Sequence, residues 1–191
     1  MVTLTAVLLA AAVTAAPTEA QEVAIGANAS MTVPKEWRAK SFPMPVRGST
    51  NLRIEIEGLK MAVTGIPVPK SKEKEGWVNP LLRDVPPEKK LEFDVMNASM
   101  QYAMRGGKQY GADESVSFKG EGYNGAVMTL TSPSQEAIFE VFPGSMYRCV
   151  TTSIVKAEKM TYVISVGSDA CDGEKHGAAL AAIKSIKLLG G

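Results

Sequence analysis

The feature that most limits the fold of this chain is a series of short strands in its C-terminal half. Runs of β-branched and aromatic residues end at glycine, proline or serine, which is the pattern of strands joined by turns. The predicted strands are 115–119, 126–131, 137–142, 146–156 and 160–167. Connections this short join antiparallel neighbours, because a parallel pair needs a crossover of about a dozen residues. We therefore predict a meander whose last two strands pair as a hairpin.

The first half of the sequence adds strands of clear period two. Leu52, Ile54 and Ile56 alternate with charged residues, and 59–64 repeats the alternation after Gly58. This pattern predicts two half-buried strands in a hairpin around that glycine. A short first strand over 31–33 ends at Pro34.

Two helices are expected. The first opens at Pro86 and Pro87 and carries an apolar stripe, and the second ends the chain with Asp172 as its predicted N-cap. The predicted fold is therefore α+β: an antiparallel sheet of about six or seven strands with a central and a C-terminal helix packed on it. We expect both helices to cover one face of the sheet, since an antiparallel sheet can leave its other face to solvent.

Residues 2–16 form an uncharged apolar run that is shorter than the roughly 20 residues of a membrane span. Such a run followed by small residues predicts a signal peptide, although no Lys or Arg precedes it; a buried N-terminal helix or strand is the alternative. Cleavage fits after Ala15 or after Ala20, and the second is favoured because a cut after Ala16 would place Pro17 next. The predicted organisation is a signal peptide over 1–20, an exposed lead-in over 21–30 and a single domain over 31–191.

Export predicts a periplasmic or secreted protein, and this compartment gives the two cysteines their meaning. In an oxidising environment Cys149 and Cys171 are expected to form a disulfide. A redox or nucleophilic thiol is the alternative, but the spacing is not that of a Cys-x-x-Cys motif.

Charge limits the partners of the protein. The formal net charge is +1, which argues against a nucleic-acid-binding protein because such a protein needs a strongly basic face. No later stretch reaches membrane-span length, so no stable membrane insertion is expected after signal cleavage. The expected partner is another envelope protein or a small ligand.

One segment concentrates groups that could carry chemistry. Asp169, Asp172, Glu174 and His176 lie within eight residues and are weak candidates for a metal site, since carboxylates and imidazole bind metal ions. The structural explanation is favoured: Asp172 caps the helix, Glu174 meets its dipole, Cys171 pairs, and His176 is exposed in the first turn. No cofactor and no catalytic residue is assigned.

Met96, Met100 and Met104 recur every four residues along the first helix. Core packing explains this spacing best, with a soft-metal site or an adaptable binding face as alternatives. Together with Trp77, these methionines are weak candidates for lining a ligand pocket.

The order of elements and three sequence segments resemble the Mog1/PsbP-like fold, including exported bacterial proteins of the DcrB kind. The segments are Val33-Pro34-Lys35-Glu36-Trp37, the closing strand Met160-Thr161-Tyr162-Val163-Ile164-Ser165 and the final helix with Ala181-Ala182-Ile183-Lys184-Ser185-Ile186-Lys187-Leu188. The resemblance implies an accessory or binding role and supplies no shared catalytic residues.

Three functions follow from these observations. The leading hypothesis is an exported, non-catalytic binding or accessory protein of the cell envelope. The first alternative is a lipid- or metabolite-binding protein with a pocket between the sheet and the methionine-rich helix. The second is a hydrolase that uses His176 with nearby acids, although the sequence contains no Gly-x-Ser-x-Gly motif.

Overall fold

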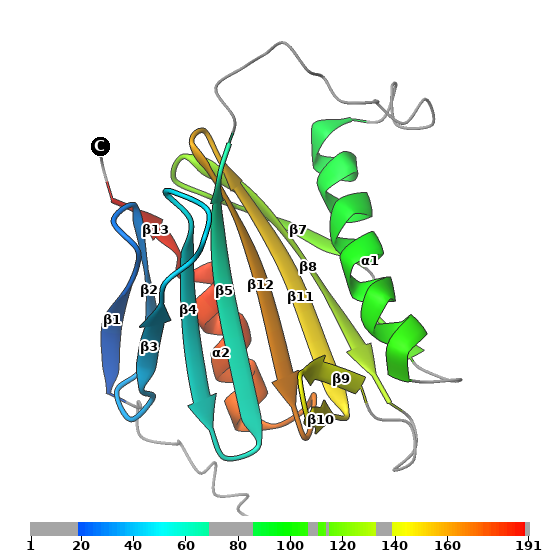
Figure 1. Ribbon diagram of the computed structural model, residues 1–191. Coiled ribbons are helices and arrows are strands. Elements are labelled where there is room, and N and C mark those ends of the chain that lie inside the picture. The colour runs from blue at the N-terminus through cyan, green and yellow to red at the C-terminus, as the bar shows by residue number, and fades with distance from the viewer. Residues whose placement is uncertain (1–18, 69–85, 107–110, 114, 133–138, 190–191) are drawn as a thin grey trace, which may run out of the picture.

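A computed structural model describes residues 19–68, 86–106, 111–113, 115–132 and 139–189 of the chain (Figure 1). The elements follow in the order β1 (Ala20–Ile25), β2 (Ala29–Pro34), β3 (Ala39–Phe42), β4 (Thr50–Ile56), β5 (Leu59–Pro67), α1 (Pro87–Gly106), β6 (Gly111–Ala112), β7 (Val116–Gly120), β8 (Tyr123–Thr131), β9 (Phe139–Phe142), β10 (Ser145–Tyr147), β11 (Cys149–Ala157), β12 (Met160–Ser168), α2 (Glu174–Lys184) and β13 (Lys187–Leu188). The predicted α+β class is confirmed, with both helices packed on antiparallel strands.

The main sheet has eight strands in the order β3-β4-β5-β12-β11-β8-β6, and β7 also pairs with β8. The predicted hairpins β4–β5 and β11–β12 are both present, and Gly58 turns the first of them with a φ of 74°. The predicted meander is only partly correct, because β9 and β10 form a separate two-stranded sheet and β11 pairs directly with β8. Its predicted last strand, β12, pairs with β5 along its whole length. The two halves of the chain therefore form one continuous sheet.

The helices lie on opposite faces of this sheet, so the expectation that both cover one face is wrong (Figure 1). On one face, α1 packs over β8 and β11 with Leu91 and Val95 at its centre. On the other face, α2 and the hairpin β1–β2 cover β5 and β12. The reason is visible in β11, where Val150 faces the α1 side while Val155 faces the α2 side, so the strand is buried on both faces and each face has its own cover.

Met96 is not part of the buried stripe of α1, whereas Met100 packs against the cluster that contains Leu91 and Val95. Leu91 and Val95 are buried, whereas Met96 is 36% exposed and Met100 is only partly buried. The side chain of Met104 lies outside the described residues, as does Trp77. The position of Met96 therefore does not support the expected pocket between the sheet and a methionine-rich helix face, because this residue is exposed and lies outside the helix face that contacts β8 and β11.

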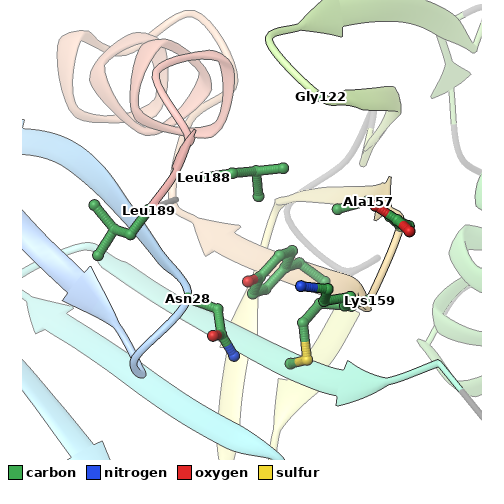
Figure 2. Close-up of a pocket in the computed structure, with 9 residues that line it drawn as sticks. Asn28, Gly122, Ala157, Lys159, Leu188 and Leu189 are labelled. Carbon is green, nitrogen blue, oxygen red and sulfur yellow. The ribbon is translucent and has the colours of Figure 1, made fainter. Parts of the chain in front are cut away.

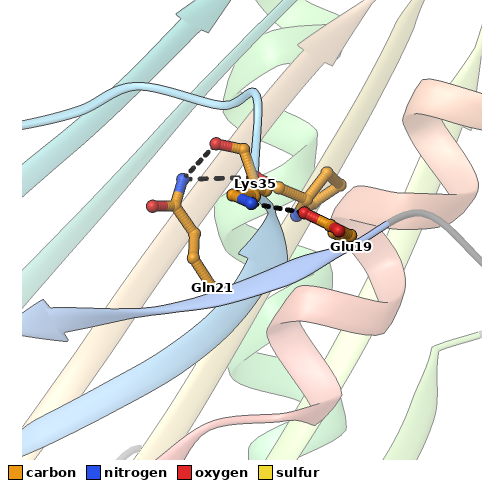
Figure 3. A network of polar contacts seen from close by, with 4 residues as sticks. Glu19, Gln21 and Lys35 are labelled. Atoms are coloured by element: carbon orange, nitrogen blue, oxygen red, sulfur yellow. Dashed lines mark hydrogen bonds and ion pairs between the residues drawn. The ribbon is translucent and has the colours of Figure 1, made fainter.

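The expected lead-in over 21–30 is instead a β-hairpin, β1–β2, which β13 extends to a three-stranded sheet. Its open end is closed by polar contacts (Figure 3). The Nε2 of Gln21 donates to the carbonyl oxygens of Lys35 and Trp37 at 2.9 and 2.6 Å, and Glu19 pairs with Lys35. The small and polar composition of this segment concealed the strands, because their stability comes from packing on the core and from pairing with β13.

Gly167 of β12 offers a test of this packing. An added Cβ would overlap the ring of the buried Tyr147, so Gly167→Ala should lower the free energy of unfolding by about 1–3 kcal/mol. The matched control is Gly177→Ala in α2, where nothing lies within 4 Å of the added Cβ and the change should stabilise by up to about 1 kcal/mol. Urea denaturation measures both, and equal stability of the two variants would contradict the packing described.

Candidate ligand-binding site

A pocket of about 310 Å³ opens where the three-stranded sheet of β1, β2 and β13, called the small sheet below, meets one end of the main sheet (Figure 2). Three turns supply its rim: Asn28 between β1 and β2, Gly122 between β7 and β8, and Glu158–Lys159 between β11 and β12. Leu188 and Leu189 form the opposite side from Ala157 and Lys159. The pocket thus depends on the ends of three hairpins and the C-terminal strand meeting at one place.

Gly122 allows this close approach of the C-terminal strand. Its φ is +77°, and a Cβ at this position would lie 3.2 Å from Cδ1 of Leu188. Leu188 is in turn held by its pairing with Ala29 in β2, and the N–H of Leu189 donates to the carbonyl of Asn28 at 2.9 Å. The position of this wall is therefore set by backbone pairing.

The lining is largely apolar. Ala157, Met160, Leu188 and Leu189 contribute aliphatic or thioether surface, and Leu189 is 44% exposed at the opening. Glu158 and Lys159 are exposed and lie in a turn at the rim. A concave site with apolar walls and few polar groups is the usual form of a small-molecule site.

Tyr162 is the exceptional member of the lining. The residue is fully buried, and among the described residues no protein group lies within hydrogen-bonding distance of its hydroxyl. Burial raises the pKa of this phenol, so it stays neutral and able to donate. A buried hydroxyl without a partner is unfavourable, which makes Tyr162 a specific attachment point for a polar atom.

Sequence analysis did not find these residues. They come from four separate segments between positions 28 and 189, and each segment by itself is an ordinary turn or strand end. The adjacent pair Leu188–Leu189 after the last helix was the available signal, because two neighbouring apolar side chains favour packing against other parts of the protein.

Cys149 and Cys171 form the predicted disulfide, with their Cα atoms 5.3 Å apart and a separation of 22 positions in the sequence. Cys149 lies at the start of β11 and Cys171 in the connection from β12 to α2. The disulfide therefore links the segment just before the N-terminus of α2 to the start of β11 in the sheet. Closing a loop of this length stabilises the fold by about 3 kcal/mol.

His176 is buried, with 1% of its surface exposed, so the expectation of an exposed histidine in the first turn is wrong. Its Nδ1 lies 2.8 Å from the hydroxyl of Ser168, and its Nε2 lies 3.1 Å from that of Thr151. The Ser168 hydroxyl also donates to the carbonyl of Ala170, so it accepts from Nδ1–H, and Thr151 donates to Nε2. The Oγ1 atoms of Thr129 and Thr151 lie 2.7 Å apart, so the hydrogen-bonded series of hydroxyl groups extends to Thr129.

This arrangement gives His176 a structural role. Both ring nitrogens are engaged by hydroxyl groups, and Cys149 Sγ lies 3.7 Å from each of them. Burial lowers the pKa of the imidazole, an effect that the carboxylate of Asp113 partly opposes. The geometry does not support the hydrolase alternative, because an enclosed and fully hydrogen-bonded imidazole has no access to a substrate.

The three acids near His176 do not join it. Asp169, Asp172 and Glu174 are exposed, and within the described part of the chain no three His, Cys, Asp or Glu side chains are placed to hold a metal ion. Asp172 is also not the helix cap, since Gly173 occupies that position without a side-chain hydrogen bond. The helix begins one residue later than expected, and Asp172 lies with Asp169 and Arg148 in a separate polar surface pocket.

With this geometry established, comparisons with known proteins define the class of the fold. No protein-family model and no curated protein matches the sequence. The chain is similar to the solution structure of the cyanobacterial PsbP (CyanoP) from Synechocystis sp. PCC 6803, with a TM-score of 0.53 and 12% identity over 95% of this chain and 99% of that one. It is also similar to the Saccharomyces cerevisiae Ran-binding protein Mog1p, with a TM-score of 0.47 and 8% identity over 90% of this chain and 96% of that one.

The protein therefore has a PsbP-like fold, in agreement with the Mog1/PsbP-like fold that the sequence pattern predicted. Identities this low establish the architecture alone. Neither α1 nor α2 is long and apolar enough to cross a membrane, and this statement covers the described residues.

The buried histidine makes stability depend on pH. The folded-state pKa of His176 lies below the unfolded value of 6.5, so below pH 6.5 the unfolded chain binds a proton that the folded protein does not. Its contribution to stability is therefore complete above pH 6.5 and is lost as the pH falls. Between pH 7.5 and 5.5 the free energy of unfolding should fall by about 1 kcal/mol more in the wild type than in His176→Gln.

Urea denaturation at the two pH values measures this difference. His176 is the single histidine of the chain, so the comparison isolates one group. An equal pH dependence in the two proteins would show that the imidazole is not buried as described.

Proposed function

We propose that this protein is an exported, non-catalytic binding protein of the cell envelope that holds a small apolar molecule in the pocket between its three-stranded sheet and its main sheet. The observation that carries this proposal is the apolar pocket of about 310 Å³ with walls from β11, β12 and β13. Its volume is at the lower end of the range for small-molecule sites. The Mog1/PsbP-like fold is compatible with a binding or accessory role.

Export is supported by two independent features. The apolar run at 2–16 has the length of a signal-peptide core and is followed by small residues suited to cleavage. The disulfide between Cys149 and Cys171 persists in an oxidising compartment and is rare in the cytosol. Together they favour a periplasmic or secreted protein.

The chemistry of the pocket favours binding over catalysis. Its apolar walls lack the paired acid and base of a proton-transfer site, and the charged groups of its rim, Glu158 and Lys159, are exposed. The titratable group in its wall is Tyr162, whose raised pKa keeps it protonated at neutral pH. Such a site holds and orients a ligand.

Filling the pocket should remove binding. Butylbenzene and 4-phenyl-2-butanone are suitable probes, and at ten times Kd a bound probe stabilises by about 1.4 kcal/mol, which raises Tm by about 4 °C. Ala157→Phe places a ring in the pocket and should abolish this rise, whereas Ala112→Phe on the exposed strand β6 should retain it. If no probe raises Tm in the wild type, the proposed function is wrong.

The position of signal cleavage tests export. Retaining Glu19 and Ala20 preserves the hydrogen bond from Lys35 N–H to the Glu19 carbonyl at 2.8 Å and the pairing of Ala20 with Pro34. These contacts favour cleavage after Ala15 over the alternative after Ala20. Mass spectrometry of the protein from the periplasm of a bacterial host should therefore find Ala16 at the N-terminus, and an intact chain confined to the cytoplasm would refute export.

A further inference from the structure

We infer that the pocket selects a neutral amphiphile of about ten non-hydrogen atoms, whose oxygen accepts a hydrogen bond from the hydroxyl of Tyr162. This inference rests on the proposed function and assigns the chemical class of its ligand. The feature that distinguishes this pocket from a purely apolar one is the phenol of Tyr162 in its wall, which is buried and has no hydrogen-bond partner among the described residues.

The position of Tyr162 follows from strand register. Tyr162 pairs with Gly65 of β5 on one side and with Val155 of β11 on the other. A Cβ on Gly65 would lie 3.0 Å from Cε1 of Tyr162, so the missing side chain leaves room for the ring to lie against the strand. The register of the strands therefore places the Tyr162 ring against Gly65.

A second hydroxyl lies beside this ring. Thr50 pairs with Gly65 from the other side, and its Oγ1 is 2.6 Å from the same added Cβ. The Thr50 oxygen is also buried and without a partner among the described residues. Two unpaired hydroxyls over one glycine give this region of the sheet a polarity that packing alone does not need.

The head group that fits is neutral. The charged residues of the lining, Glu158 and Lys159, carry opposite signs and are exposed at the rim. A carboxylate or an ammonium carried to Tyr162 would lose its hydration without gaining an opposite charge there, which is strongly unfavourable. A carbonyl oxygen loses less and gains the hydrogen bond that the phenol offers.

The size of the ligand follows from the volume. A water molecule or methylene group occupies roughly 30 Å³, so a pocket of about 310 Å³ holds about ten non-hydrogen atoms. The apolar part would lie against Ala157, Met160 and Leu188, with Leu189 at the opening.

A ligand reaches Tyr162 by displacing part of the wall, because the phenol is fully buried. The wall with the least support is β13, which has two residues and pairs with β2 alone. Movement of Leu188 and Leu189 would open the pocket without disturbing the main sheet.

Three probes with nearly the same skeleton test this inference by isothermal titration calorimetry. 4-Phenyl-2-butanone has a neutral carbonyl, butylbenzene lacks the oxygen, and 3-phenylpropanoate replaces the methyl ketone with a carboxylate. The ketone should bind the wild type about five to ten times more tightly than butylbenzene, the gain expected of one hydrogen bond. It should also bind more tightly than the carboxylate.

Tyr162→Phe removes the hydroxyl and keeps the ring. It should weaken binding of the ketone about five- to tenfold and leave binding of butylbenzene unchanged. Tyr147→Phe is the matched control, because Tyr147 is buried in the cluster on the α1 side of the sheet. This control should bind both probes like the wild type.

The outcomes separate the two proposals. If butylbenzene and the ketone bind the wild type equally, if the carboxylate binds more tightly, or if Tyr162→Phe retains full affinity for the ketone, the inference is overturned and the apolar pocket stands. If none of the three probes binds, the proposed function fails together with the inference. The wild-type comparison needs no variant, so it decides the matter even if Tyr162→Phe does not fold.

Discussion

The pairing of β5 with β12 is the interaction on which the rest of the structure depends. It runs from Met160 opposite Pro67 to Ser168 opposite Leu59 and joins two halves of the chain that are separated by the whole of α1. Because strand register determines which side chains share a face, this one pairing places Met160 and Tyr162 under the small sheet. It also sets Tyr162 beside Gly65, which leaves space for the aromatic ring.

The two ends of this sheet have different characters. At one end, the disulfide and the hydrogen-bonded His176 fasten α2 to β11 and β12, and the polar groups there are satisfied by one another. At the other end, three turns and β13 surround apolar surface and the phenol of Tyr162, for which the described part of the chain supplies no hydrogen-bond partner. The second end is better suited to bind a ligand than the first. Polar groups that already have hydrogen-bond partners have little capacity left for a ligand, whereas a group without a partner can form a new hydrogen bond.

The local patterns predicted much of the fold. The alternation at Leu52–Ile54–Ile56, the turn at Gly58 and the hairpin of β11 with β12 were all correct, because period and turn chemistry are local properties. The side of the sheet on which each helix packs was not correctly predicted. That choice depends on β11 being buried on both faces, which is not evident from its sequence because the strand contains Thr151, Thr152 and Ser153. The burial of His176 was missed for a similar reason, since its partners Ser168 and Thr151 lie on two other elements.

The sequence by itself determined the α+β class, the main hairpins, the start of α1 and the pairing of the two cysteines, because each depends on residues close in sequence or on a choice among very few partners. Only the tertiary structure decided which groups meet. It brings Asn28, Gly122, Ala157, Tyr162 and Leu188 around one pocket, and it separates His176 from the acids that precede it in sequence. The physical reason is that a binding site is made by contacts between distant segments, and those contacts are chosen by the packing of the whole core.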